Sequence, residues 1–246
     1  MKRILISLSI IGVVAVIAVG ATVAYYNDVE TSTGNTLTAG TIDLQIDLQC
    51  PRVGCDWSLR DLNGETIFGQ VCDIKPGDDG EVTLSWHVYD NNAWGRLRLA
   101  DIIDYENGCT NPEIKAGDLT CADGNAGKNL GELSQYLLFT FWMDQGSVAG
   151  WQCLDNSNGP CLDDPYEGDN VLNGVEQIFA EKTASQIISE GGVVLPEELI
   201  GSTTYYLGLK WSIPSDTGNI IQTDSLIGKV VMEAVQSRNN PWPPQF

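Results

Sequence analysis

The chain has 246 residues, with 33 Asp and Glu against only 13 Lys and Arg, which gives a formal net charge of −20. Partners such as nucleic acids and anionic membrane surfaces are bound through Lys and Arg, so this charge balance argues against both. The length suffices for one large β domain or two small ones. Frequent Gly and Asn-Gly turns, with many β-branched and aromatic residues, indicate a turn-rich β protein.

The first 24 residues have the features of an export signal. A positive start at Lys2-Arg3 precedes an almost wholly apolar run over residues 4–19, and the stretch ends on the small residue Ala24. This pattern predicts a signal peptide over residues 1–24, which a signal peptidase cuts between Ala24 and Tyr25 during export.

Two other interpretations of this segment are open. Residues 4–24 are nearly long enough to span a bilayer as an uncleaved anchor. A pilin-type signal would need Gly or Ala just ahead of the apolar run, where this chain has Arg3. Because Lys2 and Arg3 leave with a cleaved signal, the mature chain keeps 11 of the 13 basic side chains and all 33 acidic ones, a charge of −22. We expect a secreted protein of the cell surface or extracellular matrix, with membrane contact only through an uncleaved signal.

The mature N-terminus changes character along its length. Residues 25–38 are polar and predict a flexible linker. From residue 39 the sequence alternates, which predicts a first strand with one buried face. The apolar face of this strand is formed by Ile42, Leu44, Ile46 and Leu48.

Further alternating or apolar segments predict strands at residues 82–88, 97–99, 137–143, 205–213 and 228–235. A roughly 3.6-residue period predicts a helix over residues 175–189, and a second short helix is expected at residues 197–199. The predicted fold is all-β, a jelly-roll or Greek-key β-sandwich over residues 39–236 with long disulfide-bearing loops and one or two short helices. Residues 237–246 form a Pro-rich tail.

The cysteines follow the signal, and in an exported protein they predict disulfides. The economical pairing joins neighbours across Gly- and Pro-rich loops, namely Cys50 with Cys55, Cys109 with Cys121, and Cys153 with Cys161. Cys72 is then left as a buried free thiol or an intermolecular link. Six paired sulfurs can connect in 15 ways, so other pairings stay open.

The chain resembles the TasA/camelysin family of exported proteins with SipW-type signal peptides. The resemblance is carried by TVAYYND, NTLTAGTIDL and IKPGD at residues 22–28, 35–44 and 74–78, and by LKWSIP, NIIQTDS and QSRNN at residues 209–214, 219–225 and 236–240. Residues 100–200 carry no such block. The resemblance implies a secreted jelly roll, since TasA-type proteins form biofilm fibres by donor-strand exchange. Camelysin-type members are classed as surface metallopeptidases.

Residues that could perform catalysis are few. A zinc peptidase most simply needs His-Glu-x-x-His, whereas this chain has one histidine, His87, which we expect at the surface or on an edge strand. No Gly-x-Ser-x-Gly motif occurs. We therefore expect no enzyme activity and no required cofactor.

Calcium is the more credible ion because acidic loops supply the oxygen ligands that it prefers. One acidic loop predicts such a site through Asp163, Asp164, Glu167 and Asp169. A solvated acidic loop without an ion is the competing interpretation.

Three functions are open at this stage. The first is a structural subunit that self-associates into an extracellular filament or biofilm matrix, with the N-terminal segment as donor strand. The second is a camelysin-like surface metallopeptidase. The third is a monomeric adhesin or carbohydrate-binding module that uses exposed aromatic side chains, with Trp94, Trp151 and Trp242 as candidates.

Overall fold

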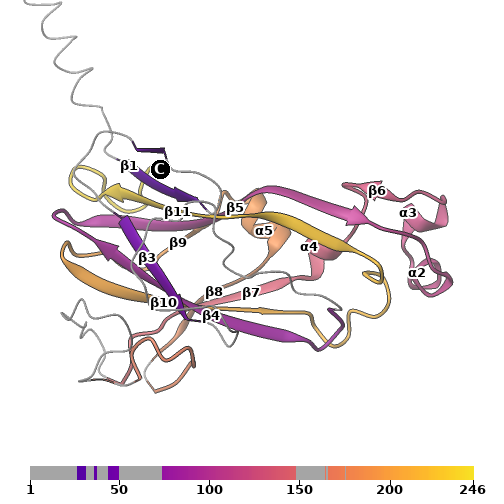
Figure 1. Cartoon of the computed structure of the whole chain (residues 1–246), viewed down its shortest axis with the longest axis horizontal. Coiled ribbons are helices and arrows are strands. Elements are labelled where there is room, and N and C mark those ends of the chain that lie inside the picture. The colour runs from indigo at the N-terminus through magenta and orange to yellow at the C-terminus, as the bar shows by residue number, and fades with distance from the viewer. Residues whose placement is uncertain are drawn as a thin grey trace, which may run out of the picture.

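A computed structural model describes residues 27–31, 36–37, 44–49, 74–147, 164, 166–174 and 176–246. These residues form two antiparallel sheets that face each other as a β-sandwich (Figure 1). The prediction of a β-sandwich is confirmed at this level. The predicted boundaries of the signal, with Ala24 and Tyr25, lie outside the described residues. Among the described residues, no helix is long and apolar enough to span a membrane.

The first sheet contains the first and the last described strands of the chain side by side. Its order is β2 (Thr36–Leu37), β1 (Asn27–Thr31), β11 (Ser225–Gln236), β5 (Ala93–Glu106) and β6 (Gly127–Lys128), and β9 (Val193–Val194) also pairs with β5. The second sheet has the order β3 (Leu44–Gln49), β4 (Asp79–Val88), β10 (Thr203–Ser212), β7 (Leu138–Met143) and β8 (Ile178–Thr183).

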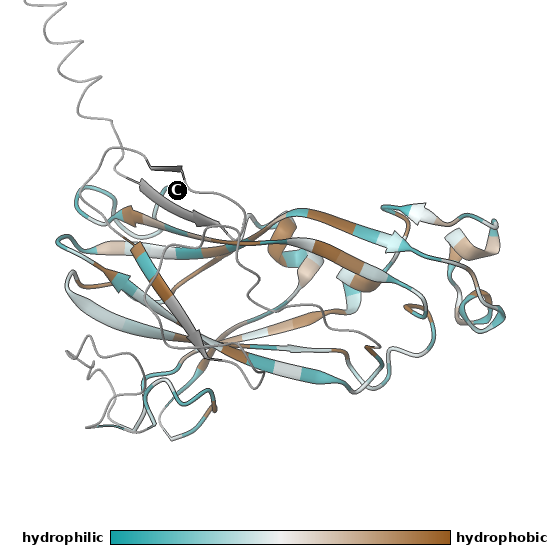
Figure 2. Ribbon diagram, in the orientation of Figure 1, coloured by the Kyte–Doolittle hydropathy of each residue, from teal (hydrophilic) through white to brown (hydrophobic). Residues whose placement is uncertain are grey.

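The core lies between the two sheets, where the alternating apolar residues of the strands meet (Figure 2). Its largest fully buried side chain is Trp86 on β4, and Leu44 and Ile46 of β3 are also fully buried. Burying one such aliphatic side chain contributes about 1.5–3 kcal/mol to stability. The period-2 pattern of the sequence therefore locates the core correctly.

The outer face of the second sheet is polar and yet buried. Thr83, Ser85 and His87 of β4 and Thr204 of β10 are at most 4 % exposed. The His87 ring lies between two hydroxyls, with Nε2 2.8 Å from Ser85 Oγ and Nδ1 3.0 Å from Thr204 Oγ1. The expectation of a surface or edge-strand histidine is wrong, because β3 pairs along β4 and makes it an inner strand.

The helix predicted over residues 175–189 is correct only in its second half. Residues 178–183 instead form β8, which pairs with β7. The helix α5 (Ala184–Ser189) begins after Thr183, whose hydroxyl accepts from the Gln186 amide while the Gln186 side chain accepts from the Thr183 amide. This capping box sets the helix start, and pairing along β7 overrides the apolar period before it.

The second helix, expected at residues 197–199, does not form. There Leu199 makes a bridge with Ala93. The described residues hold four short helices in all, rather than the one or two expected. Besides α5 these are α2 (Asn111–Ala116), α3 (Leu119–Ala122) and α4 (Leu133–Tyr136).

A small lobe projects from one end of the sandwich (Figure 1). It consists of α2, α3 and β6, and it follows β5, which continues to Glu106. The predicted disulfide between Cys109 and Cys121 closes this lobe and is confirmed. A crosslink around a loop of this size stabilises a fold by about 3 kcal/mol. The other candidates, Cys50, Cys55, Cys153 and Cys161, lie outside the described residues, as does Cys72.

The Pro-rich tail folds back over the first sheet. Trp242 packs edge-on against Trp94 of β5 with ring centroids 5.3 Å apart, and the Arg96 guanidinium lies 4.2 Å from the centre of the Phe246 ring. The Trp94 indole N–H donates to the Asn240 carbonyl over 2.7 Å. The C-terminus therefore lies beside β11 and β1 (Figure 1).

Candidate functional site

The first described strand of the chain, β1, lies near one edge of the first sheet. Strand β1 runs antiparallel along β11, with Asn27 opposite Val235 and Thr31 opposite Val231. Among the described strands, only the two-residue β2 pairs on its other side. The polar segment expected to be a linker thus contains a strand, because β11 offers a ladder of backbone groups that a polar segment can satisfy as well as an apolar one.

The β11 residues that β1 covers are deeply buried. All five residues from 231 to 235 are at most 7 % exposed, and Met232 and Ala234 belong to the core. The outward Glu233 carboxylate accepts from the guanidinium groups of Arg96 and Arg98 on β5. Strand β1 therefore pairs along a deeply buried part of β11.

The predicted donor residues lie in the other sheet. Leu44 and Ile46 are on β3, which pairs with β4 from Leu44 opposite Val88 to Gln49 opposite Thr83. Leu48 belongs to β3 but its side chain is outside the described residues, as is the whole of Ile42. The chain therefore has two N-terminal strands, β1 and β3, one in each sheet. Sequence alternation found β3 and could not find β1.

Two of the predicted calcium residues, Asp164 and Asp169, accept local hydrogen bonds through their carboxylates. Asp163 lies outside the described residues. The Asp164 carboxylate accepts from the Ser147 amide at 2.8 Å, and Asp169 accepts from the Val171 amide at 2.8 Å. Glu167 is fully buried, and its backbone bridges to Gln145. Within the described part, these carboxylates are not gathered around one point.

A buried carboxylate missed by the sequence analysis holds this loop to the second sheet. Asp144, directly after β7, is fully buried. Its carboxylate accepts from the Thr83 hydroxyl at 2.8 Å and from the Asn170 and Gly168 amides at 3.0 and 3.2 Å. Gly168 has φ +72°, and a Cβ there would lie 2.8 Å from the Tyr206 ring, so the loop packs directly on β10.

Asp144 is electrostatically coupled to Glu176 in the same loop. Burial, together with the nearby charge of Asp169, raises the pKa of Asp144 to about 6. Burial, together with the charge of Asp144, likewise raises the pKa of Glu176 to about 8. The Glu176 carboxyl accepts from the Gly146 and Asn173 amides. The pair therefore retains a proton at neutral pH.

This coupling predicts a pH dependence. Both folded-state pKa values are raised, so the stability that the pair contributes is complete below about pH 4 and is lost as the pH rises through about 6 and about 8. We expect the urea midpoint to fall between about pH 5 and about pH 9, and Glu176→Gln to reduce that fall. An equal fall in the variant would contradict the assignment to this pair.

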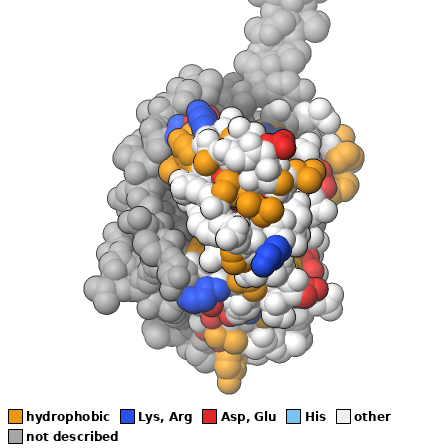
Figure 3. Space-filling model, turned by 90° about the vertical axis from the view of Figure 1, so that its right-hand side faces the viewer, with side chains coloured by type: hydrophobic (Ala, Val, Ile, Leu, Met, Phe, Trp, Pro, Cys, Tyr) orange, Lys and Arg blue, Asp and Glu red, His pale blue; other side chains and the backbone are white. Residues whose placement is uncertain are grey.

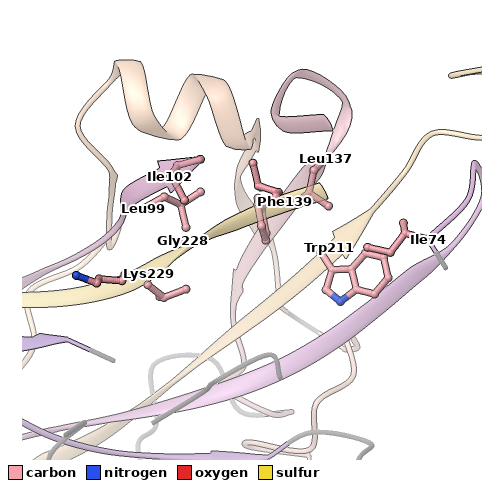
Figure 4. Close-up of a pocket in the computed structure, with 10 residues that line it drawn as sticks. Ile74, Leu99, Ile102, Leu137, Phe139, Trp211, Gly228 and Lys229 are labelled. Carbon is pink, nitrogen blue, oxygen red and sulfur yellow. The ribbon is translucent and has the colours of Figure 1, made fainter. Parts of the chain in front are cut away.

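An apolar pocket of about 150 Å³ lies between the sheets (Figure 4). Ile102 and Gly228 contribute from the first sheet, and Phe139 and Trp211 from the second. The one charged residue that lines it is Lys229, whose ammonium pairs with Asp101 and points away from the pocket. The pocket offers apolar surface without an acid, a base or a nucleophile directed into it.

No protein-family model matches the chain, and no curated protein sequence matches it either. The resemblance to the TasA/camelysin family therefore remains a hypothesis based on the short sequence blocks.

Proposed function

We propose that the protein is a secreted structural subunit of an extracellular filament or biofilm matrix, and that it assembles by exchanging its N-terminal strand. The single observation that supports this most is the position of β1, which is second from the edge of the first sheet, next to the two-residue strand β2, and pairs along β11, the last described strand. In this proposal the export signal delivers the subunit to the outside of the cell, and its jelly-roll domain provides the sheet that accepts the exchanged strand.

Strand exchange requires a segment that can leave without disturbing the order of the rest. Strand β1 precedes every other described strand, and within the first sheet it pairs only with β11 and β2. When β1 leaves, the backbone N–H and C=O groups of β11 that face it become an open edge. The β1 of a second copy restores the same hydrogen bonds, so exchange costs little free energy at equilibrium.

Because the residues of β11 opposite β1 are buried, this side of β11 should always be covered by a strand. Val231 and Val235 are at most 2 % exposed with β1 in place. An empty edge would expose apolar and unpaired polar groups together, which is the combination that drives edge-to-edge pairing. The partner is therefore another copy of the chain, with a signal peptidase acting earlier, during export.

The other two functions have weaker support. A metallopeptidase would need ligands around His87, but both ring nitrogens lie within hydrogen-bond distance of the Ser85 and Thr204 hydroxyls. An adhesin could use Trp242, which is 54 % exposed beside the half-buried Trp94. Trp151, the third aromatic candidate, lies outside the described residues.

Removing β1 tests the proposal. A chain that starts at Ser32 should stay folded but form no filaments, whereas the chain that starts at Tyr25 should form filaments visible by negative-stain microscopy and sedimentation. A matched variant of full length, Val29→Pro, removes one ladder N–H opposite Glu233 and should also reduce assembly. Filaments of unchanged length and amount from the shortened chain would overturn the proposal.

A further inference from the structure

Six carboxylates converge where the small lobe joins the sandwich. They come from four separate parts of the chain: the end of β5, the helices of the lobe, the start of α4 and the loop before β11. The residues are Asp104, Glu106, Glu113, Asp118, Glu132 and Asp224. The first four are at most 9 % exposed.

The carboxylate oxygens are close enough to share ions. Glu106, Glu113 and Asp118 each offer an oxygen, and these atoms lie within 4.8 Å of one another. Glu106 forms a second such group with Glu132 and Asp224. Two oxygens on opposite sides of a calcium ion are about 4.6–5.2 Å apart, because each Ca–O distance is about 2.3–2.6 Å.

Several of these carboxylates have one oxygen that accepts a hydrogen bond and one that has no partner. Asp118, 1 % exposed, accepts from the Cys121 amide at 3.0 Å through Oδ1, while its buried Oδ2 has no hydrogen-bond partner. Asp104 accepts from the Ser134 amide through Oδ2, and its buried Oδ1 has no partner.

The second group shows the same arrangement. Asp224 accepts from the Glu132 amide at 2.7 Å through Oδ2, while its Oδ1 is buried without a partner. Glu132 also has a buried Oε2 without a partner. The carboxylates of Asp104, Asp118 and Asp224 are therefore each held in position by one oxygen and present the other.

The negative charge of this cluster has no compensating cation in the described part of the chain. None of the ion pairs there involves any of the six carboxylates, and Lys115 and Lys128 of the lobe are exposed. Burial, together with the charges of neighbouring carboxylates, raises the pKa of Glu132 and of Asp224 to about 7. Buried charges are normally paired or bound to metal.

From the unpartnered buried oxygens and their spacing, we propose that this cluster binds calcium. The donors are oxygens only, which suits a hard cation with a flexible coordination shell. The Cys121 sulfur also lies in the first group, but it belongs to the disulfide and is no thiolate ligand. Calcium there joins α2 and α3 of the lobe to β5 and to the loop that leads into β11.

The consequence is a lobe fixed to the sandwich by an ion as well as by the Cys109–Cys121 disulfide. Figure 3 shows the end of the molecule that carries the lobe, where Asp and Glu side chains are scattered rather than gathered in one patch. That distribution fits a cluster that is mostly buried. The site is independent of β1, which lies along a different part of β11.

Calcium titration of the chelator-treated mature chain tests the site. Calorimetry should show binding, and the Tm should rise by about 5–10 °C at a calcium concentration one hundred times the Kd. Magnesium should stabilise less, because it demands octahedral geometry. A native chain with no calcium-dependent shift would overturn the proposal.

Matched variants locate the ion. Asp118→Asn keeps a good N-cap for α3 and Glu106→Gln keeps its shape, and each should weaken calcium binding at least about tenfold. The control Asp123→Asn alters an exposed carboxylate in the same lobe and should bind as the native chain does. Unchanged binding by Asp118→Asn and Glu106→Gln would place the ion elsewhere, and the proposal would fail. If either variant does not fold, the site is tested on the native chain by hydrogen exchange. Calcium addition should then raise the protection of residues 107–132 in the lobe, and unchanged protection would overturn the proposal.

Discussion

We expect a covalent bond between β1 and β11 within one subunit to abolish the proposed filament formation. Thr31 lies opposite Val231, and opposed Cα atoms in antiparallel strands are about 4.5–5.5 Å apart, within the range that a disulfide spans. We expect the oxidised Thr31→Cys/Val231→Cys chain to remain a monomer under conditions in which the mature chain assembles completely. Sedimentation and negative-stain microscopy give the two readouts.

The controls for this prediction are the two single variants. Val231→Cys places a somewhat smaller apolar side chain at a buried position, and neither single variant can form the bond, so both should still assemble. Peptide mapping distinguishes the engineered bond from any made by the seven native cysteines. Filaments from a chain shown to be fully locked would mean that β1 does not leave its own subunit.

The second large effect concerns the carboxylate that anchors the loop after β7. Asp144→Ala should lower the free energy of unfolding by about 3 kcal/mol, because it leaves the buried Asn170 amide without an acceptor and removes one of the two acceptors of the Thr83 hydroxyl. That loss corresponds to a fall in Tm of about 6–12 °C for a domain of this size. Denaturant and thermal unfolding of the monomer measure it.

Asp169→Ala is the matched control for this change. Its carboxylate is in the same loop but is partly exposed, and it accepts from Val171 and Asn173, both within that loop. We expect it to cost less than about 1 kcal/mol. Equal losses in the two variants would show that Asp144 has no special role in holding the loop to the sheet.

Strand alternation predicted most of the sandwich because a half-buried strand has a period of two residues. The inward residues of β3 and β4 follow from that period alone, and so does the strand at β10. The Cys109–Cys121 disulfide was predictable for a different reason, since nearby cysteines in an acidic, Gly-rich loop have few other partners.

Long-range contacts explain what the sequence analysis missed. Strand β1 is polar, and only pairing with β11, two hundred residues away, makes it a strand. His87 has the pattern of an outward residue, but neighbouring strands and hydroxyls enclose it. The carboxylates of the lobe are spread from Asp104 to Asp224, so no local motif brings them together. A calcium site was predicted in the acidic loop around Asp164 because its carboxylates lie close together in sequence.

The most direct test of strand exchange uses a mixture of the two single variants, one carrying Thr31→Cys and the other Val231→Cys. In this mixture a bond between positions 31 and 231 can form only between different chains. After assembly and mild oxidation, mass spectrometry should find the peptide linked through these positions in the filaments and not in the unassembled fraction. Filaments that form from the mixture without this linked peptide would contradict exchange of β1 between subunits.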